Sequence, residues 1–146
     1  MIVLDACVAA KWLLPESGSP AALALQEGPE QLLAPALIRL EVAAAITRRV
    51  RAEKEKDRLR PEEAVERCGK WFRLLDQAIL SLIPEHDLLD DAVNLSVEFK
   101  HPLQDCLYLA AAIHFDASLV TADPKFFRRV SGRFPKMSML EGCQAN

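Results

Sequence analysis

Short apolar runs alternate along the chain with longer segments that carry apolar residues at helical spacing. The apolar runs predict five strands, at residues 2–5, 31–34, 79–83, 118–121 and 136–140. The segments between them predict helices over residues 8–14, 21–27, 35–54, 87–99, 102–113 and 124–130, and a further helix from residue 61. Because strands and helices alternate, we predict an α/β fold of three layers, a central parallel sheet flanked by helices on both faces.

Prolines and apolar stripes define several of these helices. Pro35 and Pro102 are expected in the first turn of the helices that they introduce, where proline is favoured. The helix from residue 61 carries apolar residues at helical spacing: Val65, Cys68, Phe72 and Leu75. The helix over residues 87–99 carries a second stripe: Leu88, Ala92, Leu95 and Phe99.

The composition is that of one soluble globular domain, which we expect to span residues 1–146. Hydrophobic residues make up 51% of the chain and charged residues 27%, and the length allows a full core. No apolar run approaches the roughly 20 residues that cross a membrane. Asp5 interrupts the first apolar stretch and no basic segment precedes it, so we expect no signal peptide and a cytoplasmic protein.

Four cysteines are widely spaced along the chain: Cys7, Cys68, Cys106 and Cys143. They form neither a Cys-x-x-Cys motif nor a cluster with histidine, which argues against a zinc site or a redox pair. In a cytoplasmic protein we expect free thiols, with Cys7 and Cys106 acting as small core residues.

Four carboxylates border the most apolar segments of the chain: Asp5, Glu41, Asp105 and Asp123. Asp5 ends the first predicted strand, Asp123 lies just past the fourth, and Glu41 and Asp105 lie early in predicted helices. In a parallel α/β sheet, strand ends and the starts of the following helices meet at one edge. We therefore expect the four side chains to converge on one crevice.

Such a crevice needs a counter-charge. Two carboxylates about 4 Å apart repel by roughly 4 kcal/mol at an effective dielectric of 20, so four cannot all stay ionised without protons or cations. We expect no histidine or cysteine beside these acids, and an all-oxygen site favours Mg²⁺ or Mn²⁺ over zinc. Such ions bind substrate phosphates, so the implied chemistry is phosphodiester hydrolysis.

Each acid also has a purely structural interpretation. Asp5 could cap the helix that follows it, Asp123 could start a turn, and Asp105 could be a first-turn acid favoured by the helix dipole. Glu41 is harder to explain in this way, because Arg39 lies on nearly the opposite helix face and one of the two must face protein. One shared site explains the four acids better than four separate structural roles.

Five short motifs, in order along almost the whole chain, resemble those of the PIN-domain ribonucleases. They are VLDACVAAKW at 3–12, AP at 34–35, LEVA at 40–43, HPLQDCLYLA at 101–110 and LVTADPKF at 119–126. The likeness is strongest to the VapC-type toxins of bacterial toxin–antitoxin pairs. No family motif falls between residues 53 and 82.

The resemblance implies a PIN fold with an acidic site at one edge of the sheet. It implies that Asp5, Glu41, Asp105 and Asp123 bind Mg²⁺ or Mn²⁺ directly or through water, and that the hydroxyl of Thr121 supports the site. By the same resemblance, the protein is a metal-dependent endoribonuclease and the toxin of a toxin–antitoxin pair. A homodimer and a cognate antitoxin that holds it inactive are implied as well.

A basic segment follows Asp123, with five basic residues and no acid before Glu141. The candidates for contacts with the RNA backbone are Lys125, Arg128 and Arg129. A solvated face is the alternative for the two arginines. Three rings are interleaved and are expected in the core: Phe126, Phe127 and Phe134. The mixed charges of residues 48–60 favour a solvated helix end.

Other functions are compatible with parts of the pattern. An aspartate-based phosphatase or a phosphoreceiver domain also places Asp after its first strand, but the phosphatase signature needs a second Asp where Cys7 stands. A degenerate PIN domain that only binds a partner should have lost acidic residues, and a housekeeping PIN nuclease would lack an antitoxin. His101 is interpreted as a helix-entry residue rather than a catalytic one, and Trp12 and Trp71 as packing or dimer-contact residues.

Overall fold

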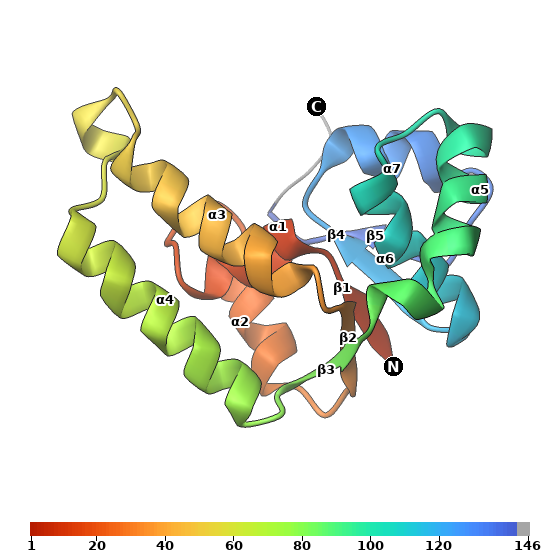
Figure 1. Ribbon diagram of the computed structural model, residues 1–146, viewed down its shortest axis with the longest axis horizontal. Coiled ribbons are helices and arrows are strands. Elements are labelled where there is room, and N and C mark those ends of the chain that lie inside the picture. Colours follow the sequence, from red (N-terminus) through yellow and green to blue (C-terminus); the bar gives the residue numbers. More distant parts are fainter. Residues whose placement is uncertain (143–146) are drawn as a thin grey trace.

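The computed structural model describes residues 1–142, which contain a five-stranded sheet (Figure 1). The strands are β1 (Ile2–Leu4), β2 (Leu32–Pro35), β3 (Leu80–Ile83), β4 (Ser118–Thr121) and β5 (Met137–Met139). The α-helices in this part of the chain are α1 (Ala6–Ala9), α2 (Ser19–Glu27), α3 (Ile38–Val50), α4 (Pro61–Asp76), α5 (Leu89–Phe99), α6 (Leu103–His114) and α7 (Pro124–Val130). Short 3-10 helices are η1 (Ala10–Trp12), η2 (Glu55–Asp57) and η3 (Glu85–Asp87). The alternation of strands and helices confirms the predicted α/β architecture.

All five strands are parallel and lie in the order β3-β2-β1-β4-β5. The central strand, β1, pairs with β2 on one side and with β4 on the other. The chain therefore leaves β1 toward β2 and β3 and returns on the opposite side at β4. In such sheets the crevice at this change of direction, outside the carboxyl ends of the strands, is the usual binding site. The residues that follow β1 and β4 border this crevice.

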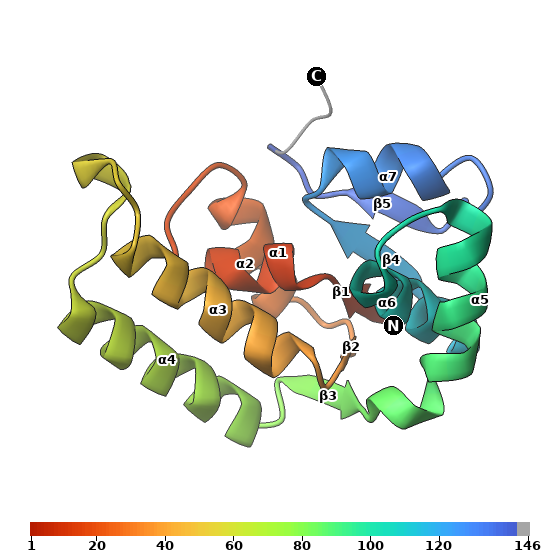
Figure 2. The same cartoon turned by 45° about the horizontal axis from the view of Figure 1, so that its top comes forward.

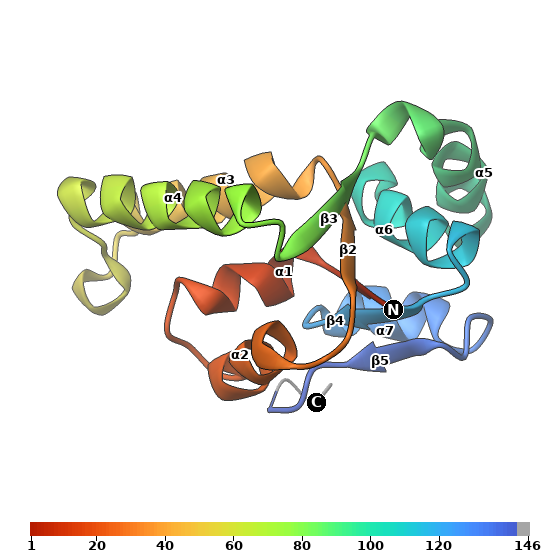
Figure 3. The ribbon, with the colours of Figure 1, turned by 90° about the horizontal axis from the view of Figure 1, so that it is seen from below.

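Helices flank the sheet on both faces, as predicted (Figures 2 and 3). α6 packs against β1, β2 and β4, α5 packs on α6, and α7 packs against β4 and β5. α3 and α4 pack together and form a pair that extends to one side of the sheet (Figure 1). Among residues 1–142, no helix combines the length and the apolar character needed to cross a membrane.

The prediction that Pro35 starts a helix is wrong. Pro35 ends β2, where it is paired with Ile83, and the N–H of Ala36 donates to the Ile83 carbonyl at 2.8 Å. This hydrogen bond to β3 keeps the chain extended through Pro35, so α3 begins only at Ile38. Pro102 likewise precedes its helix, as the N-cap of α6 rather than its first residue.

α3 also ends earlier than predicted, at Val50 instead of near residue 54. The carbonyl of Arg49 accepts a hydrogen bond from the N–H of Leu59 at 2.9 Å. In a continued helix that carbonyl would bind the N–H four residues later. The returning chain has taken its place, so the helix stops.

The first predicted helix, over residues 8–14, is divided in two. The side chain of Asp5 accepts a hydrogen bond from the N–H of Cys7 and thereby caps α1, which starts at Ala6. After Ala9 the helix tightens into η1 and ends at Trp12, three residues before Pro15. The capping interpretation of Asp5 is thus correct as a local description.

The predicted stripe on α4 is only partly buried. Val65 and Phe72 are 74% and 45% exposed, whereas Ala64 and Trp71, each one position earlier, are buried. One position corresponds to about 100° around a helix, so the buried face is rotated from the predicted stripe. The other two members of the stripe pack partly against the core. The stripe on α5 does face the core, with Leu88 buried at its start.

Trp12 and Trp71 pack against each other within the chain. Their ring centroids are 6.1 Å apart, and both side chains are buried. Trp12 also donates its Nε1–H to the carbonyl of Ala22 at 2.8 Å. The pair thus joins η1, α2 and α4, and internal packing rather than dimer contact accounts for both tryptophans.

Cys7, Cys68 and Cys106 are free thiols, as predicted. Cys106 is buried and Cys7 is partly buried, in agreement with their expected place in the core. Cys143 lies outside the described residues.

Replacing Trp71 with Ala should lower the free energy of unfolding by about 3–5 kcal/mol, because it leaves a cavity against Trp12. Urea denaturation measures this change. Val65→Ala on the exposed side of α4 is the control and should change stability by less than about 0.5 kcal/mol. Equal losses for the two variants would contradict the buried position of Trp71 between α4 and Trp12.

Candidate active site

Asp5 lies directly after β1 and is the most deeply buried of the four acids, with 6% of its surface exposed. Its N–H extends the sheet by donating to the Val120 carbonyl on β4 at 3.1 Å. The hydroxyl of Thr121 donates to Asp5 Oδ2 at 2.6 Å, and the N–H of Cys7 donates to Asp5 Oδ1 at 3.3 Å. One carboxylate therefore caps α1 and also stands at the crevice between β1 and β4.

Thr121 connects Asp5 with Asp123. Its buried hydroxyl donates to Asp5 and accepts a hydrogen bond from the N–H of Asp123 at 3.0 Å. Asp123 in turn caps α7, because its Oδ1 accepts from the N–H of Lys125 at 2.7 Å and of Phe126 at 3.3 Å. The Thr121 hydroxyl therefore lies between two of the acids.

Glu41 faces protein in the first turn of α3, while Arg39 is exposed on the other side of the helix. This arrangement agrees with the argument from helix geometry. The fully buried Tyr108 on α6 donates its hydroxyl to Glu41 Oε2 at 2.5 Å. Tyr108 lies one turn after Asp105 on α6. The same face of α6 therefore carries one acid, Asp105, and the tyrosine that donates to another acid, Glu41.

Asp105 lies in the first turn of α6, beside His101. The Nε2 atom of His101 is 2.8 Å from Asp105 Oδ2, although the contact lacks the alignment of a regular hydrogen bond. The imidazole ring is stacked on Phe126, with the centroids 4.9 Å apart and the planes at 7°. The expectation that no histidine or cysteine lies beside the acids is therefore wrong. His101 adjoins Asp105, and Cys7 adjoins Asp5 and Thr121, with its Sγ 3.5 Å from the Thr121 hydroxyl.

The four carboxylates lie close enough to act on one another electrostatically. Burial raises the pKa of Asp5, and the charge of Asp123 raises it further, against the hydrogen bonds from Thr121 and Cys7. Burial also raises the pKa of Glu41, to which the charges of Asp5 and Asp105 add. The pKa of Asp105 is raised by burial and by the charges of Asp5 and Asp123, while His101 lowers it. The structure thus brings all four predicted acids to one place.

The donor set fits a hard divalent cation, since it offers carboxylate oxygens from four elements at one sheet edge. Each carboxylate contacts a different protein group. In the order Asp5, Glu41, Asp105 and Asp123, these groups are the Thr121 hydroxyl, the Tyr108 hydroxyl, the His101 ring and the N–H groups at the start of α7. Within residues 1–142, no three His, Cys, Asp or Glu side chains are arranged to hold an ion as they stand. The residues therefore match such a site in chemistry and share one edge of the sheet, while their present arrangement serves these protein contacts.

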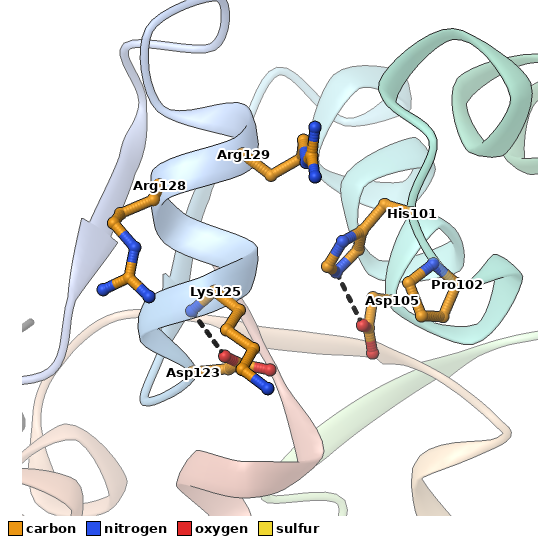
Figure 4. Close-up of a pocket in the computed structure, with 7 residues that line it drawn as sticks. All are labelled: His101, Pro102, Asp105, Asp123, Lys125, Arg128 and Arg129. Atoms are coloured by element: carbon orange, nitrogen blue, oxygen red, sulfur yellow. Dashed lines mark hydrogen bonds and ion pairs between the residues drawn. The ribbon is translucent and has the colours of Figure 1, made fainter.

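A cleft of about 620 Å³ opens beside two of the acids, between the start of α6 and the helix α7 (Figure 4). We call it the α6–α7 cleft. Its lining residues are His101, Pro102, Asp105, Asp123, Lys125, Arg128 and Arg129. The three basic side chains come from α7: Lys125 lies beside Asp123, Arg129 points toward His101, and Arg128 extends on the side of the helix away from Asp105 (Figure 4). The structure thus brings the predicted RNA-binding residues to the acidic site.

A comparison with protein families identifies the family to which this chain belongs. The model of the PIN domain matches residues 2–133 of the chain. The chain belongs to the PIN domain family. A solved structure of similar fold is a toxin–antitoxin complex from Klebsiella pneumoniae, with a TM-score of 0.67 and 16% sequence identity over 94% of this chain and 96% of that chain. The comparison with curated proteins found no significant match.

Three supporting residues of this PIN domain were not predicted from the sequence: Cys7, His101 and Tyr108. A buried tyrosine hydroxyl needs a hydrogen-bond partner, and Tyr108 stands three residues after Asp105 in an otherwise apolar helix. That spacing was the available signal for Tyr108. The three phenylalanines do pack with the core as predicted, with Phe126 fully buried.

The raised pKa values of Asp5, Glu41 and Asp105 imply that the folded metal-free PIN domain binds protons more tightly than the unfolded chain. Their stabilising contribution is present below the ordinary values of 3.8 and 4.5. It is lost as the pH rises through the raised pKa values.

Asp5→Asn should therefore gain stability relative to the wild type across this pH range. The difference in free energy of unfolding should grow by up to about 1.4 kcal/mol per pH unit. Urea denaturation in EDTA at a series of pH values measures it. The exposed Asp90→Asn is the control and should follow the wild-type curve. Parallel curves for Asp5→Asn and the wild type would contradict a raised pKa at Asp5.

Proposed function

We propose that this PIN domain is an endoribonuclease that depends on Mg²⁺ or Mn²⁺. The observation that carries the proposal is the convergence of four mutually repelling carboxylates at the carboxyl edge of the sheet, next to a basic cleft. Carboxylates that repel in a partly buried place are stabilised by a bound cation, and the basic cleft beside them suits a phosphodiester substrate.

In the proposed site Asp5, Glu41, Asp105 and Asp123 hold the metal. When bound, such an ion lowers the pKa of a water and stabilises the charge on the leaving oxygen. The chain's own groups keep the four carboxylates in place. Thr121 holds Asp5, and the buried hydroxyl of Tyr108 holds Glu41.

Lys125, Arg128 and Arg129 are proposed to bind the RNA backbone in the α6–α7 cleft. They share this cleft with Asp105 and Asp123, so phosphates bound there lie beside the metal site. Phe126 is fully buried beneath His101 and has no free face for a base. Recognition in this cleft is therefore assigned to charge on the backbone rather than to base stacking on the helix.

We further propose that the protein is one cytoplasmic domain, a homodimer, and the toxin of a toxin–antitoxin pair with a cognate antitoxin. The similar fold of a toxin–antitoxin complex supports the toxin assignment. A short neighbouring gene for an antitoxin-like protein would favour it over a housekeeping PIN nuclease. The presence of all four acids argues against a degenerate binding module, and the family match argues against a phosphatase or phosphoreceiver domain.

Purified protein free of any partner should cleave total RNA with Mg²⁺ or Mn²⁺, and EDTA should abolish the cleavage. Asp5→Asn and Asp105→Asn should each lower the rate on the order of 100-fold or more, because losing a metal-binding carboxylate costs several kcal/mol of transition-state stabilisation. Gel electrophoresis of the RNA measures this. Asp90→Asn removes an exposed carboxylate elsewhere and should cleave like the wild type. Cleavage that survives EDTA, or that persists in both site variants, would refute the metal-nuclease proposal.

Tyr108→Phe should weaken Mn²⁺ binding about 10- to 100-fold, because groups that orient a metal-binding carboxylate typically contribute that much to affinity. Isothermal titration calorimetry of the free protein measures the affinity without reference to cleavage. Phe keeps the ring and removes only the hydroxyl that donates to Glu41. Unchanged Mn²⁺ affinity together with reduced stability would reduce Tyr108 to a packing role.

A further inference from the structure

A second cleft, of about 790 Å³, opens next to the acidic site and belongs to different elements. We call it the α1–α3 cleft. Its walls come mainly from the α1–η1 segment and from the end of α3 with the residues after it, and Cys7 and Ala122 also line it. Ala122 lines this cleft, whereas its neighbour Asp123 lines the α6–α7 cleft. The two clefts share no lining residue and meet at this Ala122–Asp123 step.

Cys7, which lines the α1–α3 cleft, also supports the acids. The N–H of Cys7 donates to Asp5, and the Sγ atom of Cys7 accepts from the N–H of Ala122 at 3.1 Å. Burial and the charge of Asp5 raise the pKa of the Cys7 thiol, so this residue adds no negative charge to the cleft. The cleft is therefore lined by a residue, Cys7, that directly contacts an acid of the proposed metal site.

The charged part of the lining of this cleft is predominantly basic. Four of the lining side chains are cationic: Lys11, Arg48, Arg49 and Arg51. Glu16 and Asp57 are the acids of the lining, which leaves a surplus of two positive charges. Residues 48–60 were expected to form a merely solvated helix end, but three of their arginines gather at this cleft.

Part of the basic lining is held in place by an ion-pair network. Glu16 lies between Lys11 and Arg49, with Oε1 2.8 Å from Lys11 Nζ and Oε2 2.5 Å from Arg49 Nη2. Lys11 is only 9% exposed, so its side chain is held largely out of solvent beside Glu16. Arg48 and Arg51 are exposed and form no ion pair with any residue of the range 1–142. These two guanidinium groups are available to an anionic ligand.

We propose that the α1–α3 cleft binds backbone phosphates of the RNA on the side of the scissile bond opposite to the α6–α7 cleft. The inference rests on the proposed ribonuclease function. A strand whose scissile phosphate lies at the acids must leave the site in two directions, and two separate basic clefts adjoin the acids. Arg48 and Arg51 contact the phosphates, and the Lys11–Glu16–Arg49 network positions the wall beneath them.

The test compares two double variants that lose the same charge. Arg48→Gln/Arg51→Gln removes the free guanidinium groups of the cleft, and Lys54→Gln/Lys70→Gln removes two exposed charges outside it. Binding of a short fluorescein-labelled single-stranded RNA is measured by fluorescence anisotropy in EDTA, over a series of salt concentrations. All replaced side chains are exposed, and circular dichroism verifies that each variant is folded.

The arginine variant should bind the RNA about tenfold more weakly than the wild type. The slope of log affinity against log salt should fall in magnitude by about 1.4, since each phosphate contact on a single strand contributes about 0.7. The lysine variant should keep the wild-type slope. Equal slopes for the two variants would overturn the proposal and leave an acidic protein segment as the occupant to consider.

The position of the RNA is tested with a substrate whose cleavage site has been mapped. Shortening the RNA on one side of the cleavage site should remove the effect of Arg48→Gln/Arg51→Gln and keep that of Lys125→Gln/Arg128→Gln. Shortening the other side should do the reverse. Dependence of both variants on the same side would overturn the arrangement while leaving the nuclease proposal intact. Absence of RNA binding and cleavage by the wild type would overturn the proposed function itself.

Discussion

Mutual repulsion among four carboxylates at one edge of a parallel sheet is the constraint around which this PIN domain is organised. Two such charges about 4 Å apart repel by roughly 4 kcal/mol at an effective dielectric of 20. The fold answers with a separate polar partner for each acid. These partners come from β4, α6, α7 and His101, two residues before α6. The packing that places these elements side by side therefore also supplies the partners that offset the repulsion among the acids.

Structural and functional interpretations of the acids are not alternatives in this protein. Asp5 caps α1 and Asp123 caps α7, as their sequence context suggested. Each uses one oxygen for its cap, and in Asp5 the other oxygen accepts from Thr121. A cap fixes the carboxylate at the junction of a strand and a helix, and that junction is where the carboxyl ends of the strands meet. The local role thus supplies the position that a shared site needs.

α3 links the acidic site to the basic surface. Its first turn presents Glu41 to Tyr108, and its last turn carries Arg48 and Arg49 toward η1, where Glu16 joins Arg49 to Lys11. The boundaries of α3 are set by contacts with distant segments. Pairing with Ile83 keeps Pro35 in β2, and Leu59 ends the helix by taking the carbonyl of Arg49. Both ends of the helix are therefore placed by the fold rather than by helix propensity.

The sequence by itself determined the order of strands and helices, the parallel sheet and the four acids, because periodicity and the borders of apolar runs are local properties of a chain. The partners of the acids were decided only by the tertiary structure. Tyr108 meets Glu41, His101 stacks on Phe126, and three arginines gather near Lys11 because helices distant in sequence pack together. The rotation of the buried face of α4 was decided in the same way, by the contact of Trp71 with Trp12. Contacts between remote residues leave no periodic signal. Thr121 was named by the family resemblance and Tyr108 had a signal in its spacing from Asp105, but the contact of His101 with Asp105 and the second basic cleft emerged only from the fold.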